Sequence, residues 1–173
     1  MGARLLKRWL ALPLKDANAI SERHQVVGYL KDTPEVLREI QQQIKKISDL
    51  ERLISKIAAG KVSPREVVYL RDSLDAIIPI KALTEKSSNT SVKQMGMQLD
   101  ACELLREKIG ATLNPNAPVS IAKGNAIARG VNAELDELRV ISHSGKEFLE
   151  AIEARESERT GISSLKISFN NVF

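Results

Sequence analysis

The most constraining feature of this sequence is a long helical pattern near its C-terminus that continues beyond its own hydrophobic stripe. Asn132 can cap this helix, and Gly161 can end it in a left-handed conformation. The apolar positions follow a helical spacing: Leu135, Leu138, Ile141, Phe148 and Ile152. Residues 153–160 remain helix-forming but are polar on every side. Roughly 28 residues with a rise of 1.5 Å each reach about 42 Å, so the pattern predicts a helix that projects into solvent.

Capping signals divide the preceding chain into further helices. Thr33-Pro34 and Ser63-Pro64 each place proline at the first helical position behind a capping side chain. Asp16 and Ser48 are candidate caps of two more helices. Pro79 would remove a backbone hydrogen bond from the helix that begins at residue 64, so a kink or break is expected there.

Apolar residues at a three-and-four spacing also predict one long helix over residues 92–109. Its stripe comprises Val92, Met95, Leu99, Cys102, Leu105 and Ile109. Aromatic residues make up only 3% of the chain while 43% is hydrophobic, so aliphatic side chains must fill the core. Such a core suits packed helices better than a β-sandwich.

Two segments carry β signals. Residues 119–121 and 126–128 flank Lys123-Gly124-Asn125, which predicts a short hairpin. Residues 165–169 alternate as a strand, and such a strand needs a neighbour, so we expect that a segment outside this chain continued the sheet. The predicted fold class is all-α: an elongated multi-helix bundle with a short β-hairpin and a C-terminal β-strand.

The residue types that carry chemistry are scattered. His24 and His143 are far apart and belong to no metal-ligand spacing, and a G-x-x-x-x-G-K-[ST] phosphate loop is missing. Cys102 is predicted to be a buried, inert thiol, and Trp9 a core anchor. The acidic residues at 147, 150, 153 and 156 indicate a solvated helix face. We therefore expect no catalytic, cofactor-binding or metal-binding residue in this chain.

Charge is unevenly distributed along the sequence. The net charge is +4, but residues after Val131 hold five basic and eight acidic side chains, so that part carries −3 and the rest +7. This balance permits nucleic-acid contact without demanding it. The single cysteine fits a reducing cytoplasm, and the sequence has no run of about 18 apolar residues that would span a membrane.

Several motifs, in order along the whole chain, resemble the core or lever domain of the bacterial MutS family of DNA mismatch-repair proteins. The opening Met1-Gly2-Ala3-Arg4-Leu5-Leu6-Lys7-Arg8-Trp9-Leu10 is similar to the start of that domain. The similarity continues through residues 49–53, 57–58, 64–66 and 70–74. Residues 134–139, 158–162 and 165–173 resemble the long lever helix of the family and the entry into its DNA clamp.

The resemblance implies residues 1–160 as the first half of the helical lever domain and residues 161–173 as the truncated start of the clamp. It implies a lever that relays nucleotide-driven motion between an ATPase domain and the clamp. ATP and Mg²⁺, a mismatch-reading domain, double-stranded DNA bound through the clamp and a homodimer would belong to the full-length protein, in the bacterial cytoplasm at the nucleoid. The chain itself would not be an enzyme.

Two roles follow for named residues. The apolar stripe Leu135, Leu138, Ile141, Phe148 and Ile152 is predicted to hold the lever helix to its bundle. Lys166 is a candidate contact to the DNA backbone. The alternatives are a stand-alone helical protein-interaction module and a stand-alone DNA-binding domain, and strong salt-sensitive DNA binding by this chain alone would favour the latter.

Overall fold

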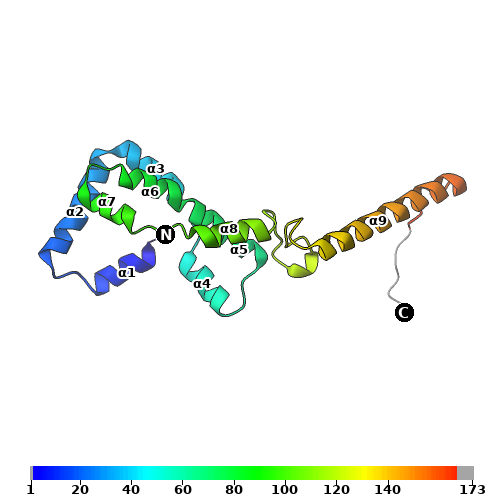
Figure 1. The fold of residues 1–173 in the computed structure, drawn as a ribbon, viewed down its shortest axis with the longest axis horizontal. Coiled ribbons are helices and arrows are strands. Elements are labelled where there is room, and N and C mark those ends of the chain that lie inside the picture. The colour runs from blue at the N-terminus through cyan, green and yellow to red at the C-terminus, as the bar shows by residue number, and fades with distance from the viewer. Residues whose placement is uncertain (1, 167–173) are drawn as a thin grey trace. The chain divides into compact units, whose positions relative to one another are not determined.

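The computed structural model describes residues 2–166 and divides the chain into two compact units, residues 1–128 and 129–173 (Figure 1). The helices of the first unit are α1 (Ala3–Ala11), α2 (Ala17–Asp32), α3 (Pro34–Ile44), α4 (Leu50–Ala58), α5 (Pro64–Asp75), α6 (Ile77–Glu85), α7 (Thr90–Met97) and α8 (Glu103–Thr112). The second unit contains α9 (Ala133–Thr160). The helical part of the predicted fold class is thus confirmed.

Local capping signals place most helix starts correctly. The Ser63 hydroxyl accepts a hydrogen bond from the Glu66 N–H, and the Glu66 carboxylate accepts one from the Ser63 N–H, which is a complete capping box for α5. The fourth cap was placed one residue early, because the Asp49 carboxylate accepts from the Arg52 N–H. Ser48 instead donates its N–H to the Ser73 hydroxyl.

Pro79 breaks the helical path as predicted. Helix α5 ends at Asp75, and α6 begins at Ile77 with Pro79 in its first turn. The first N–H groups of a helix have no intrahelical partner, so a proline there removes no hydrogen bond.

The predicted single helix over residues 92–109 is wrong. Helix α7 ends at Met97 and α8 starts at Glu103. Between them the Asp100 carboxylate accepts the Cys102 N–H at 2.8 Å, and Cys102 adopts a left-handed conformation with φ of 47°. The predicted burial of Cys102 is wrong for the same reason, since this turn exposes its thiol.

The main core of the first unit joins α4, α5 and α8. Its buried members are Leu53, Leu70, Leu74 and Ile109. Ser73 is fully buried beside this core, and its hydroxyl is satisfied by donating to the Tyr69 carbonyl at 2.6 Å and accepting from the Ser48 N–H at 2.9 Å.

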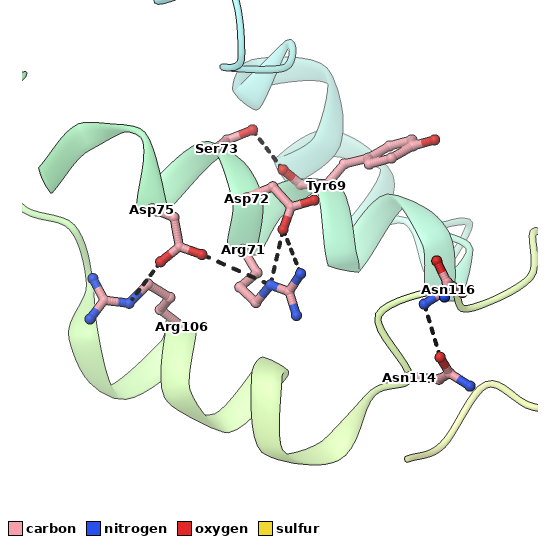
Figure 2. A network of polar contacts seen from close by, with 8 residues as sticks. All are labelled: Tyr69, Arg71, Asp72, Ser73, Asp75, Arg106, Asn114 and Asn116. Carbon is pink, nitrogen blue, oxygen red and sulfur yellow. Dashed lines mark hydrogen bonds and ion pairs between the residues drawn. The ribbon is translucent and has the colours of Figure 1, made fainter. Parts of the chain in front are cut away.

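Ion pairs line the same α5–α8 contact (Figure 2). Arg71 contacts Asp72 at 2.6 Å and Asp75 at 4.0 Å, and Arg106 of α8 reaches Asp75 at 3.1 Å. The two arginine side chains are largely covered while their acidic partners are about half-exposed. Of these three pairs, the Arg106–Asp75 pair ties α8 to α5 at the edge of the core, where screening by solvent limits its strength.

The β part of the predicted fold class is wrong. Within residues 2–166 the structure has no strand, and residues 121–123 form a 3₁₀ helix where the hairpin was expected. Residues 126–128 pair with the end of α8 instead: Asn114 donates to the Ala126 carbonyl, and Ala128 donates to the Thr112 carbonyl. An isolated antiparallel bridge between Leu113 and Ile127 completes this contact.

The predicted C-terminal strand is wrong for the two of its residues that the structure describes. Leu165 and Lys166 form no strand, and Leu165 instead donates its N–H to the Ile162 carbonyl. The remaining residues of that prediction, 167–169, lie outside the described part of the chain.

Candidate functional site

Helix α9 is capped at both ends by the residues that the sequence indicated. The Asn132 side chain accepts a hydrogen bond from the Leu135 N–H at 2.8 Å. At the other end Gly161 is left-handed with φ of 73° and donates its N–H to the Ser157 carbonyl. These caps confirm the bounds of a 28-residue helix, whose length follows as about 42 Å from the helical rise.

The apolar stripe of α9 lies on the surface of its unit. Leu138, Ile141 and Phe148 are 56%, 66% and 68% exposed, while Leu135 and Ile152 are half-buried. No described side chain of α9 is buried. The positions 138, 141, 145, 148 and 152 alternate steps of three and four, which is the seam spacing of a left-handed coiled coil. The stripe therefore has the geometry to receive another helix, and its role in holding the lever stays a prediction.

Charged residues surround this stripe with a net acidic surface. Eight acidic and four basic residues lie between Ala133 and Thr160. Near the C-terminal end Arg159 donates to Glu156 at 2.7 Å and forms an ion pair with it. The His143 Nδ1 lies 3.2 Å from the Glu147 carboxylate one turn away. Pairs of this kind support a solvent-exposed helix by a few tenths of a kcal/mol each.

Asp136 organises the start of α9. One carboxylate oxygen accepts the Gly130 N–H at 2.6 Å, and the other accepts from Arg139 at 2.8 Å. The Gly130 N–H, together with the Arg139 guanidinium, holds the pKa of the Asp136 carboxyl below its usual range. Sequence reasoning missed this arrangement, although an acidic residue in the first turns of a helix behind a glycine turn is a usable signal.

A shallow groove in the first unit lies between α1, α2 and α7. Its apolar lining includes Trp9, Leu14, Val27 and Met95. The Arg23 guanidinium carbon stands 3.9 Å from the centroid of the Trp9 ring, a cation–π contact. Trp9 is 43% exposed, so its predicted role as a core anchor is wrong: α1 contains no buried residue.

The remaining candidates do not form a reactive site in the described structure. His24 and His143 are both exposed, and the described residues hold no group of three potential metal ligands. Lys166 is exposed, and its proposed contact with DNA stays a prediction. Among residues 2–166, no helix is both long enough and apolar enough to cross a membrane.

Comparisons with known proteins give a consistent result. A family model described as MutS domain III matches residues 1–167. The DNA mismatch repair protein MutS of Flavobacterium johnsoniae is 75% identical over 173 residues, which is 100% of this chain and 20% of that protein. The proteins of the same name from Christiangramia forsetii and Bacteroides thetaiotaomicron are 57% and 51% identical with the same coverage. The chain thus spans about a fifth of the length of these relatives.

Proposed function

This chain belongs to the MutS domain III family, and on that basis we propose that it is the first part of the lever in a DNA mismatch repair protein. In this role it relays nucleotide-driven motion from an ATPase domain to a DNA clamp. ATP, Mg²⁺, mismatch recognition and dimer formation belong to the rest of the protein, which acts in the bacterial cytoplasm at the nucleoid.

The observation that supports the proposal best is the continuity of α9. Its 28 residues run without a proline or an internal break between two specific caps. A continuous hydrogen-bonded helix transmits a displacement applied at one end to the other, whereas a kinked or frayed helix absorbs part of it.

The exposed stripe supports the same role. A long helix in water draws most of its stability from packing, yet Leu138, Ile141 and Phe148 are more than half exposed in this chain. The family resemblance implies a second half of the lever after the clamp, and its returning helix is the partner that the seam would receive. The pairing would stiffen α9 and keep its apolar side chains from water.

The test uses a full-length chimera, in which this chain replaces the corresponding segment of the Flavobacterium johnsoniae relative. Ala151→Pro removes a hydrogen bond in the interior of α9 and costs about 3 kcal/mol or more locally. Ala133→Pro is the matched control, because it makes the same exchange at the first helical position behind the extended residue Asn132. The measurement is the affinity for a mismatched duplex with and without ATP, together with the rate of ATP hydrolysis.

We expect the Ala151→Pro chimera to hydrolyse ATP and bind DNA while ATP loses its effect on DNA affinity. The Ala133→Pro chimera should respond to ATP like the unmodified chimera. If the Ala151→Pro chimera retained the full ATP response, a rigid α9 would not be the relay.

The role of the exposed apolar stripe of α9 as a packing surface is tested separately by introducing a charge. Phe148→Asp places a carboxylate within the proposed helix contact, and Ala154→Asp places the same charge on the opposite, exposed face. Only Phe148→Asp should weaken the ATP response. Equal behaviour of the two variants would exclude the stripe as a packing surface.

A further inference from the structure

Asp136 makes two hydrogen bonds to the turn through which the chain enters α9, one through its backbone and one through its side chain. Gly130 has a φ of 82°, in the left-handed region, and it lies two residues before the cap residue Asn132. The Asp136 N–H donates to the Asn132 carbonyl at 3.1 Å, so the backbone of Asp136 is bound to the cap. Its carboxylate accepts the Gly130 N–H at 2.6 Å, which binds the turn ahead of the cap to the same residue.

We propose that Asp136 is a positioning residue that fixes the direction in which α9 leaves the turn at Gly130. The consequence for ATP-driven motion rests on the lever function proposed above, whereas the positioning itself does not. Arg139, one turn further along α9, holds the second carboxylate oxygen at 2.8 Å and so keeps the first oxygen aimed at Gly130.

Because α9 is long, a small change in direction at the start of the helix produces a large displacement of its far end. A change of about 10° in the direction of a helix about 42 Å long moves its far end by about 7 Å. A capped helix still leaves most of its first N–H groups without partners, and its terminal turn frays easily. The Asn132 side chain restrains only the first helical turn of α9, whereas the Asp136 carboxylate restrains the non-helical turn at Gly130 that precedes the helix. The carboxylate is therefore placed to hold the helix direction rather than only to begin the helix.

The test uses the full-length chimera described above, with its cysteines, including Cys102, replaced by serine. Val131→Cys beside Gly130 and Ala154→Cys on the exposed face of α9 then supply two exposed labelling sites within the second unit. The distance distribution between spin labels at these two positions is recorded, and the hydrogen exchange of the Gly130 amide is followed. Asp136→Ala is compared with Asp136→Asn, which keeps an acceptor oxygen.

Two controls separate positioning from stability. Glu134→Ala removes an equal charge in the first turn of α9, where Glu134 has no hydrogen bond or ion pair in the described structure. Gly161→Ala strains the left-handed cap at the opposite end and lowers the stability of α9 without touching its start. Melting temperatures show whether Gly161→Ala and Asp136→Ala destabilise the protein to a similar degree.

We expect Asp136→Ala to speed exchange of the Gly130 amide on the order of tenfold, as loss of a charge-assisted hydrogen bond implies, and to broaden the distance distribution. Asp136→Asn should restore part of both effects, and the two controls should leave both unchanged. An unchanged distribution in Asp136→Ala, or equal broadening in Gly161→Ala, would overturn the positioning role. A broadened distribution with an unaltered ATP response would uphold that role and overturn the lever function.

Discussion

Thr84 Oγ1 occupies the place where a side chain on Gly96 would begin: a Cβ added to Gly96 would lie 2.2 Å from that oxygen and 2.8 Å from the Thr84 Cβ. Both residues are buried, and the Thr84 hydroxyl is anchored on the carbonyls of Ile80 and Lys81, each at 2.9 Å. The close approach of α6 and α7 therefore depends on the absence of a side chain at position 96.

Gly96→Ala should lower the free energy of unfolding of the first unit by about 1–3 kcal/mol, because the helices must separate to admit the methyl group. Gly28→Ala is the matched control, since its Cβ would meet nothing within 4 Å in α2. That exchange should stabilise the protein by about 0.5–1 kcal/mol through helix propensity. Urea unfolding of both variants gives the comparison, and a stabilised Gly96→Ala would refute the close contact.

The capping box of α5 should be lost in acid. Lys56, followed by the Ser63 N–H and hydroxyl, lowers the pKa of the Glu66 carboxyl from 4.5 to about 2. Because the folded pKa is depressed, the stabilisation is present above pH 4.5 and disappears as the pH falls toward 2.

Glu66→Gln should therefore reduce the melting temperature at pH 7 but have a smaller effect near pH 2. The control is Glu35→Gln, which makes the same exchange in the first turn of α3, where Glu35 has no hydrogen bond or ion pair in the described structure. A pH-independent deficit in Glu66→Gln would contradict the expected protonation.

Helix α1 should be less protected from hydrogen exchange than α5, which contains four buried residues. Helix α1 contains no buried residue, and the contacts found for its side chains are the pairing of Arg4 with Asp49 and Glu51 and the stacking of Arg23 on Trp9. Hydrogen exchange should be faster in α1 than in α5, and Arg4→Ala should accelerate it further without affecting α5. Lys7→Ala, one turn along the same helix, is the control, and an unaltered exchange rate in Arg4→Ala would rule out the anchoring.

Cys102 should react with a thiol reagent in the folded protein. The turn formed by Asp100 leaves the thiol exposed, so labelling should proceed in native buffer at a rate close to that in denaturant. Cys102→Ser provides the blank, because the chain has no other cysteine. Strong protection of the Cys102 thiol in native buffer would contradict the exposed turn and favour the single helix that the sequence predicted over residues 92–109.

DNA binding by this chain alone should be weak, reduced by salt and equal for matched and mismatched duplexes. A net charge of +4 supports loose contact with phosphates, and salt weakens such binding because the release of counterions from DNA then gains less entropy. Binding is measured at low and at physiological salt with Lys166→Ala and Lys61→Ala as paired variants. Tight, mismatch-selective binding would favour a stand-alone DNA-binding domain over the lever.

The correct predictions depend on hydrogen bonds between residues that are close together in the sequence. The starts of α2, α5 and α9 follow from residues within one turn of each other, because a cap satisfies N–H groups only two or three positions away. The extent of α9 between Asn132 and Gly161 was readable for the same reason. The prediction of one helix over residues 92–109 was wrong because the helical spacing of apolar residues continues by coincidence across the turn at Asp100.

The helical content, most of the helix boundaries and membership in the MutS domain III family could be predicted from the sequence, because these depend on local hydrogen bonding and on ordered motifs. The three-dimensional fold was needed to show that residues 126–128 pair with the end of α8, that Trp9 lies under Arg23, and that Asp136 holds the turn at Gly130. Each of these contacts joins groups beyond one helical turn. Their formation depends on how the chain closes its loops and on which neighbours then lie within reach.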